Sequence, residues 1–226
     1  MSLIAIGDIH GMRKKLQELW GEITVSKEDD IVIFLGDYID RGPESRQVVD
    51  FILELKDDGY KIVTLRGNHE DMYLACLNGL TTLAGGEEQY EDNDEVCGVF
   101  LWNGGNKTVK SYRWKNPNKK HMDFFNSTLV KYETDQYIFV HAGLNPRKPL
   151  NQQTELDYMW IREEFIHSKR NFGKTVIFGH TPTFTIHGHK KYEPFVMDNK
   201  IGIDTGCFFK GKLTALWLPT GDFVQV

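Results

Sequence analysis

Six side chains of types that bind metal ions stand in short motifs spread along the chain. They are Asp8, His10, Asp37, Asn68, His141 and His180. Oxygen and imidazole ligands without a thiolate suit Mn²⁺, Fe or Zn²⁺. Six side chains are too many for one catalytic ion that must keep an open position. They suit two ions about 3.5–4 Å apart that share one carboxylate. The residue types therefore predict a centre with two divalent ions, Mn first and Fe or Zn as alternatives.

Short apolar runs precede these motifs and must position them. The runs are Leu3–Ile6, Ile31–Leu35, Lys61–Leu65, Tyr137–Val140 and Thr175–Phe178. Helical spacing over Arg13–Trp20 and Val48–Leu55 separates the first three runs. Continuous apolar runs that alternate with amphipathic helices predict parallel strands with crossover helices, an α/β fold. The active crevice of such sheets lies outside the carboxyl ends of the strands, so we expect the six ligands to meet there.

Residues 71–130 break this alternation. Met72–Asn78 continues a helix, an acidic loop is expected from Gly85 to Glu95, and an aromatic stretch follows. We expect a mostly helical insertion that caps the sheet edge, within one domain that spans residues 1–226. The tract Trp102–Asn106 is interpreted equally well as a wall of a substrate pocket or as a plain turn. Residues 195–203 and 212–218 predict antiparallel β-structure.

Composition bounds the possible partners. The 226 residues carry a formal charge of −5, with 40% hydrophobic and 26% charged residues. An acidic balance argues against a general nucleic-acid binder. No apolar run is long enough to span a bilayer and no signal pattern opens the chain, which predicts a cytoplasmic protein without a membrane partner. The three cysteines, Cys76, Cys97 and Cys207, are expected to be unpaired, and His121 and His167 to be solvated.

Five motifs resemble those of the calcineurin-like metallophosphoesterases. They are Gly7–Gly11, Gly36–Gly42, Leu65–Glu70, His141–Gly143 and Gly179–Pro182. Asp40-Arg41-Gly42 and Arg66-Gly67-Asn68-His69-Glu70 narrow the resemblance to the phosphoprotein phosphatase family, in its prokaryotic type similar to bacteriophage lambda protein phosphatase. The resemblance implies a four-layer α/β/β/α sandwich with central mixed β-sheets.

The resemblance also implies a role for each site residue. Asp8 and His10 would hold the first ion, Asp37 would bridge, and Asn68, His141 and His180 would hold the second. His69 would be the general acid, oriented by Asp40. Arg41 and Arg162 would bind phosphoryl oxygens. For Arg66 and Glu70, which flank the third motif, we expect structural support, with Glu70 accepting from neighbouring backbone or pairing with Arg66.

The activity implied by the resemblance is hydrolysis of phosphate monoesters, by direct attack of a hydroxide that bridges the two ions. The expected substrate is a phosphoserine or phosphothreonine protein or peptide, or a small phosphoester. One alternative is symmetrical hydrolysis of dinucleoside polyphosphates; the 46 residues after His180 argue against it, because such enzymes look longer. An alternative of another class is a non-catalytic scaffold. The oligomeric state stays open.

Overall fold

The first of two β-sheets carries the N-terminal motifs. The computed structural model describes residues 2–78, 93–188 and 191–226. The first sheet has the strand order β10-β9-β1-β2-β3. Its strands are β1 (Leu3–Ile6), β2 (Ile31–Phe34), β3 (Lys61–Thr64), β9 (Thr214–Leu218) and β10 (Phe223–Gln225). β1, β2 and β3 are parallel, and β9 is antiparallel to both β1 and β10.

The second sheet carries the C-terminal histidine motifs and has the order β4-β5-β6-β8-β7. Its strands are β4 (Lys131–Glu133), β5 (Tyr137–Val140), β6 (Thr175–Phe178), β7 (Phe195–Met197) and β8 (Lys200–Gly202). β5, β6 and β8 are parallel, whereas β4 and β7 are antiparallel neighbours. The antiparallel β-structure expected over 195–203 and 212–218 is present but divided between the sheets, because β7 pairs with β8 while β9 joins the first sheet.

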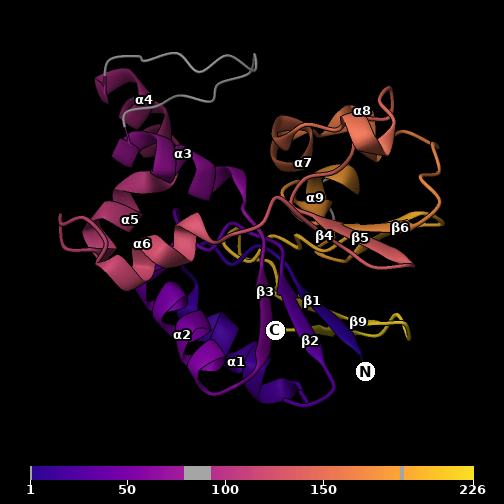
Figure 1. Ribbon diagram of the computed structural model, residues 1–226, viewed down its shortest axis with the longest axis horizontal. Helices are drawn as coiled ribbons and strands as arrows, with labels where there is room; N and C mark the ends of the chain where they lie inside the picture. The colour runs from indigo at the N-terminus through magenta and orange to yellow at the C-terminus, as the bar shows by residue number, and fades with distance from the viewer. Residues whose placement is uncertain (1, 79–92, 189–190) are drawn as a thin grey trace.

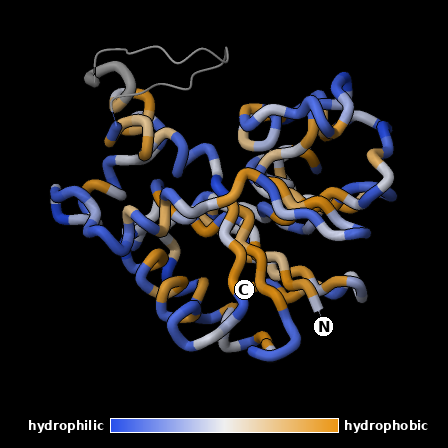
Figure 2. The backbone as a smooth tube through the Cα atoms, in the orientation of Figure 1, coloured by the Kyte–Doolittle hydropathy of each residue, from blue (hydrophilic) through white to orange (hydrophobic). Residues whose placement is uncertain are grey.

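Alternation of side chains along the strands produces four layers. Ala5 and Ile33 of the first sheet share a buried cluster with Phe139 and Ile177 of the second, so these two faces pack against each other. The opposite face of the first sheet packs against α1 (Arg13–Glu22) and α2 (Ser45–Asp57). The opposite face of the second sheet packs against α7 (Glu155–Trp160) and α8 (Glu163–Ile166). Figure 1 shows this order of layers, and Figure 2 shows hydrophobic residues along the strands of both sheets. The predicted sandwich is confirmed.

The crossover helix α2 follows from its sequence pattern. Val48, Val49, Ile52 and Leu55 recur at helical spacing, and all four are buried. This stripe covers the sheet while the opposite face stays polar, which is the usual amphipathic arrangement of a surface helix. Because α2 connects β2 to β3 in parallel, both strands bring their carboxyl ends to the same edge.

The region expected as an insertion is largely helical where it is described. It contains α3 (Asn68–Asn78), α4 (Asn93–Phe100), the π-helical turn η1 (Leu101–Gly105), α5 (Asn106–Ser111) and α6 (Lys119–Asn126). These helices lie beyond the β3 edge of the first sheet, beside α2 (Figure 1). Most of the expected acidic loop, with Gly85, lies outside the described residues. Its last part, Asn93–Glu95, is helical rather than a loop.

The remaining described helices are short. They are η2 (Leu150–Gln152) and α9 (Thr183–Ile186). Within residues 2–78, 93–188 and 191–226, every helix is too short or too polar to cross a bilayer.

Two of the cysteines are joined, contrary to expectation. Cys76 of α3 and Cys97 of α4 form a disulfide with a Cα–Cα distance of 4.7 Å. No local pattern indicates this disulfide, because the two residues are 21 positions apart and meet only when the insertion folds. Cys207 is free and buried, as predicted.

His121 is buried and not solvated as expected. Its Nδ1 lies 2.7 Å from the hydroxyl of Tyr112, and its Nε2 lies 2.9 Å from Oδ1 of Asp50. The imidazole thereby joins α6 to α2 and to the turn after α5. Burial lowers the pKa of His121, and Asp50 raises it in part. His167 is exposed and pairs with Glu163, in agreement with the prediction.

The variant His121→Ala should lower the free energy of unfolding by about 2–3 kcal/mol, since it leaves the buried Tyr112 hydroxyl without its partner. The loss should shrink as pH falls below about 6.5. The pKa of His121 is lowered in the folded state. As pH falls below about 6.5, the unfolded chain therefore binds a proton on this histidine before the folded protein does, and the stability of the wild type declines. Urea unfolding at pH 7.5 and 5.5 measures both effects. His167→Ala should change neither value by more than a few tenths of a kcal/mol; equal losses in the two variants would contradict this role for His121.

Candidate metal centre

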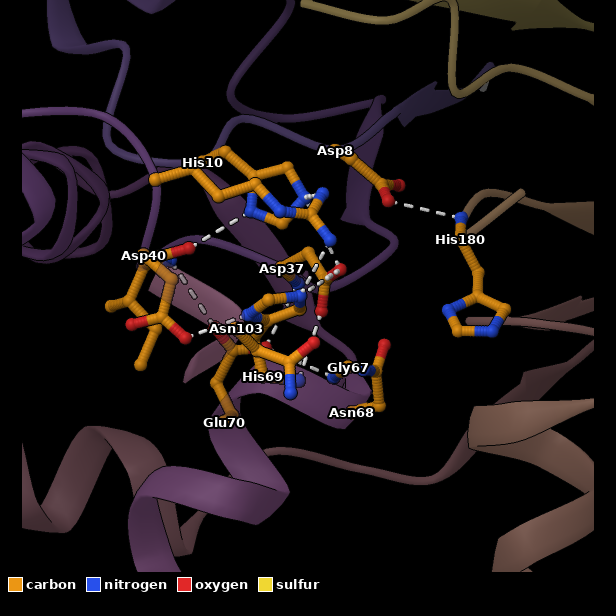
Figure 3. A network of polar contacts seen from close by, with 12 residues as sticks. Asp8, His10, Asp37, Asp40, Gly67, Asn68, His69, Glu70, Asn103 and His180 are labelled. Carbon is orange, nitrogen blue, oxygen red and sulfur yellow. Dashed lines mark hydrogen bonds and ion pairs between the residues drawn. The ribbon is translucent and has the colours of Figure 1, made fainter. Parts of the chain in front are cut away.

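All six predicted ligands meet at one edge of the two sheets. His10 follows β1, Asp37 follows β2, and Asn68 opens α3 after β3. His141 directly follows β5, and His180 follows β6 by two residues. These five residues and Asp8 are all buried. Figure 3 shows the side chains from the first sheet facing His180 of the second sheet. Because the site lies where both sheets end, its two halves come from distant parts of the chain.

Asp37 stands between two groups of side chains that could each hold an ion. One oxygen, Oδ2, lies 3.4 Å from Nε2 of His10 and 3.8 Å from Nε2 of His69. The other oxygen, Oδ1, lies 3.4 Å from Nε2 of His141. His141 Nε2 in turn lies 3.1 Å from Nδ1 of His180. In both groups the potential ligand atoms lie within 4.8 Å of one another. This arrangement is the one that a bridging carboxylate would have.

The imidazoles of His10 and His141 are oriented by backbone carbonyls. His10 Nδ1 donates to the carbonyl of Ile39 at 3.0 Å, and His141 Nδ1 donates to that of Leu35 at 2.9 Å. In each ring the proton is therefore on Nδ1, and the lone pair of Nε2 points into the site. For His141 that lone pair faces Oδ1 of Asn68 at 3.1 Å, which is also an acceptor. A cation between these acceptor atoms would satisfy them.

Two further atoms of the site lack partners. Asp8 Oδ1 and His180 Nε2 are buried without a hydrogen bond among the described residues. The other oxygen of Asp8 accepts from the backbone N–H of His180 at 3.0 Å. A buried unpaired carboxylate oxygen is costly unless a cation or donor satisfies it. The residues present thus fit a metal site, as the sequence predicts.

The electrostatics of the site lead to the same conclusion. Burial raises the pKa of Asp8, and the negative charges of Asp204 and Asp37 raise it further. A nearby cation would reverse this effect and stabilise the carboxylate. Burial lowers the pKa of His10 and of His180, which keeps both imidazoles neutral. Neutral imidazole is the form that binds metal ions.

Several site residues adopt the left-handed backbone conformation that favours glycine. These residues have φ values between 48° and 71°: His10, Asp37, Asp40, Arg41 and His180. Each lies in a tight turn at the end of a strand. Such backbone strain gathers at functional sites, where surrounding contacts must hold it in place. Close packing helps to hold the turn that carries Asp37, because a Cβ on Gly67 would lie 2.1 Å from Oδ1 of Asp37.

Glu70 holds the turn that carries Asp37. One carboxylate oxygen accepts from the backbone N–H groups of Asp37 at 2.8 Å and Gly67 at 3.0 Å, and the other accepts from that of Tyr38 at 2.9 Å. The predicted backbone-supporting role of Glu70 is confirmed. Arg66 does not pair with it and instead donates to the Thr128 hydroxyl.

We expect Glu70→Gln to destabilise the protein by about 3 kcal/mol, because the amide NH₂ would face buried N–H donors that the carboxylate accepts. The shift of the urea midpoint at constant m-value measures this loss. Glu163→Gln makes the same substitution at an exposed position on α8 that lacks the backbone bonds, and it should leave the midpoint within experimental error. Matching shifts in the two variants would show that only net charge matters.

His69 and Asp40 form the predicted pair. His69 Nδ1 lies 2.6 Å from Oδ2 of Asp40, so Nδ1–H donates to the carboxylate and Nε2 faces the site. The Thr108 hydroxyl donates to the other oxygen of Asp40 at 2.6 Å. The backbone N–H of Asp40 donates to Thr108 and to Ser45. Thr108 belongs to α5, so the helical insertion directly supports the predicted acid. No sequence signal distinguishes this threonine from others.

The structure brings Arg41 into the site. Its two terminal nitrogens lie 2.5 Å from Nε2 of His10 and 3.0 Å from Nε2 of His69. The guanidinium thus places positive charge beside the first group of ligands. Its backbone N–H donates to the carbonyl of Gly104, whose φ is 100°. A Cβ on Gly104 would lie 2.9 Å from the backbone nitrogen of Arg41. The tract Trp102–Asn106 thus contacts the site through Gly104, and its role as a wall of a substrate pocket stays a prediction.

Arg162 lies on the side of the second sheet. It donates to the backbone carbonyl of His180 at 3.0 Å and to the Thr181 hydroxyl at 3.2 Å. Its charge interacts with Asp37, Asp204 and Asp8. Arg162 is thus at the site, in contact with the turn that positions His180. Its role in binding phosphoryl oxygens stays a prediction.

Asp204 is a buried site residue that the sequence analysis missed. Burial raises its pKa to about 6, while the charges of Arg41 and Arg162 lower it. Its Oδ1 accepts from the backbone N–H of Gly206 at 3.0 Å. Asp204 comes two residues after β8, a parallel strand of the second sheet. The rule of polar residues at strand ends could have found it, had β8 been recognised as a separate parallel strand.

Comparison with known proteins agrees with this geometry. The chain is 28% identical over 250 residues to the bis(5′-nucleosyl)-tetraphosphatase PrpE (asymmetrical) of Anoxybacillus flavithermus, covering 98% of this chain and 92% of the relative. It is 25% identical to the protein of the same name from Oceanobacillus iheyensis, covering 100% and 92%. A crystal structure provisionally described as a diadenosine tetraphosphatase shares the fold, with a TM-score of 0.71, 20% identity and coverage of 100% and 92%.

The family assignment rests on a match along most of the chain. The model of the calcineurin-like phosphoesterases matches residues 1–205, which include all five motifs and every residue of the site described above. The chain belongs to the calcineurin-like phosphoesterase family, whose members are metal-dependent hydrolases.

Proposed function

We propose that the protein hydrolyses dinucleoside tetraphosphates at a centre of two divalent ions, with Mn²⁺ as the expected ion and Fe or Zn²⁺ as alternatives. The observation that carries the chemistry is the position of Asp37 between two groups of converging ligand atoms. The first ion would be held by Asp8, His10 and Asp37. The second ion would be held by Asp37, Asn68, His141 and His180.

The choice of substrate rests on the curated relatives. Two relatives named as asymmetrical bis(5′-nucleosyl)-tetraphosphatases match over nearly the whole chain. The chain covers 92% of each, so the short C-terminal part no longer argues against a dinucleoside substrate. These matches favour the dinucleoside alternative over the expected protein serine/threonine phosphatase. Since their names specify asymmetrical cleavage, we expect ATP and AMP from diadenosine tetraphosphate, not the two ADP molecules of the symmetrical alternative.

The protein side chains would divide the remaining work. Bound divalent ions supply a nucleophile at neutral pH and draw negative charge from the phosphoryl oxygens. His69 is oriented by Asp40 with Nε2 towards the site, so a proton on Nε2 can pass to the leaving oxygen. Arg41 presents two guanidinium nitrogens beside that imidazole. The planar fork of arginine matches phosphoryl oxygens and stabilises charge that develops on them.

The scaffold alternative is disfavoured by the completeness of the site. Contacts between the side chains or their turns bring all six ligand positions, His69 and Arg41 together at the same edge of the sheets. A protein that had lost catalysis would have no need to keep strained turns around neutral imidazoles.

The decisive experiment compares substrates under identical conditions. Mn²⁺-loaded protein is incubated with diadenosine tetraphosphate, a phosphoserine peptide and an aryl phosphate, and products are separated by anion-exchange chromatography. We expect ATP and AMP in equal amounts, with kcat/KM at least tenfold above that for the peptide. Faster phosphate release from the peptide would overturn the proposed substrate. Two ADP molecules would retain the substrate class but overturn the asymmetrical cleavage.

A further inference from the structure

A group of exposed aromatic side chains borders the candidate site. Phe208, Phe209 and Tyr192, which we call the aromatic ledge, are 36%, 39% and 38% exposed. None of the three belongs to the hydrophobic clusters that form the core. Large apolar side chains that gather on the surface usually mark a binding site.

The aromatic ledge is held in a fixed arrangement. The rings of Phe208 and Phe209 have centroids 5.4 Å apart in an edge-to-face contact. The ring of Phe184 contacts both Phe209 and Tyr192, with centroid distances of 5.6 Å and 5.3 Å. The Tyr192 hydroxyl donates to the carbonyl of Phe209 at 3.1 Å. A Cβ on Gly211 would lie 2.4 Å from the Tyr192 ring, so this glycine allows the ring to lie against the loop.

The aromatic ledge is continuous with the side of the site where Arg41 lies. The guanidinium carbon of Arg41 lies 5.4 Å from the centroid of the Phe209 ring. The nitrogens of the same guanidinium contact His10 and His69. The loop between β8 and β9, which carries Phe208 and Phe209, also carries Asp204, which is buried in the site. A phosphate held by Arg41 would thus have an aromatic surface on one side and the imidazole that faces the reaction on the other.

We propose that the aromatic ledge stacks a nucleobase of the substrate, so that Phe209 sets the preference for nucleoside phosphates over other phosphoesters. This inference rests on the proposed function and names a part of its substrate. Bases stack on aromatic side chains without sequence preference, because every base has a π-face. In a nucleotide one ribose separates the phosphate from the base, which fits an aromatic surface beside the phosphate-binding arginine.

Calorimetry measures directly how much the base contributes to binding affinity. Mn²⁺-loaded protein is titrated with AMP and with ribose 5-phosphate, which differ only by the base. In the wild type we expect AMP to bind about tenfold more tightly. In Phe209→Leu the ratio of the two dissociation constants should fall to about one, with ribose 5-phosphate unaffected. Phe209→Trp should keep or raise the ratio, because an aromatic face is restored. Trp114→Leu, which removes an exposed aromatic residue in the turn after α5, should leave the ratio unchanged.

The outcomes separate this inference from the proposed function. An unchanged ratio in Phe209→Leu would overturn the inference even if diadenosine tetraphosphate is the best substrate. A ratio lost in Phe209→Leu but restored in Phe209→Trp would support it even if the dinucleotide is not cleaved, in which case only the proposed function fails. If Phe209→Leu weakened the binding of AMP and of ribose 5-phosphate equally, Phe209 would merely position Arg41, and the inference would be overturned. A larger loss of affinity for a phosphotyrosine peptide than for AMP would also overturn it, by assigning the ledge to a phosphotyrosine ring.

Discussion

Replacement of His69 by asparagine should slow the hydrolysis of alkyl phosphates by about 10²–10⁴-fold, the usual contribution of a positioned general acid. The leaving oxygen of an alkyl phosphate is strongly basic and needs a proton as the bond breaks. A phosphate leaving from a dinucleoside tetraphosphate is far less basic, so its hydrolysis should slow much less. Single-turnover rates with an alkyl phosphate, an aryl phosphate and diadenosine tetraphosphate measure this order of effects.

The control for His69→Asn is metal content. His69 Nε2 lies 3.8 Å from Oδ2 of Asp37, farther than the Nε2 of His10. We therefore expect the variant to retain two ions by elemental analysis, as the assigned ligand set leaves His69 out. Equal slowing of all three substrates would contradict the role of His69 as acid. Loss of an ion would instead place His69 among the ligands.

Asp37→Asn should reduce bound metal from two ions to one or none and lower kcat/KM by at least 10³-fold. Burial alone raises the pKa of Asp37, but the electrostatic interactions with His141, His69, His10 and Arg41 outweigh burial and lower it. Asp37 is thus a carboxylate in the folded protein, and its two oxygens face the two ligand groups. An amide offers one weakly basic oxygen and cannot bridge two cations. Elemental analysis after gel filtration measures the ions retained.

The matched control for Asp37→Asn is Asp57→Asn. Asp57 is exposed and pairs with Lys120 at the surface, so its loss should leave metal content and activity unchanged. Retention of both ions by Asp37→Asn would contradict its position as the shared ligand. The apparent affinity for the second ion, obtained by titration of the metal-free variant, shows which half of the site is lost.

The sequence predicted the strands that carry the site with little error. Apolar runs such as Leu3–Ile6 and Thr175–Phe178 match their strands residue for residue, because buried parallel strands require continuous apolar sequence. The distribution of the last strands between two sheets was not predicted. Pairing depends on which edge is available in the folded protein, and local sequence does not encode that.

The candidate metal ligands, His69 and Arg41 were predictable because motifs fix their residue types. The residues that hold them were not. Thr108 reaches Asp40 from a helix 68 positions later, and Gly104 contacts Arg41 from the same insertion. Such contacts arise only from tertiary packing. His121 was misjudged for the same reason, since its polar sequence neighbours gave no indication of the surrounding aromatic residues.

The contact between Asp8 and His180 would link the supply of metal to the persistence of the folded protein. The Asp8 carboxylate accepts from the His180 backbone across 172 positions of sequence, so no fragment of the chain can assemble the site. Ions that bind only when both sheets have docked stabilise that docked state by mass action. A ligand at 1,000 times its dissociation constant contributes about 4 kcal/mol. A metal-starved cell would then contain a protein that is inactive and also unfolds more readily, so metal scarcity would reduce its abundance as well as its turnover.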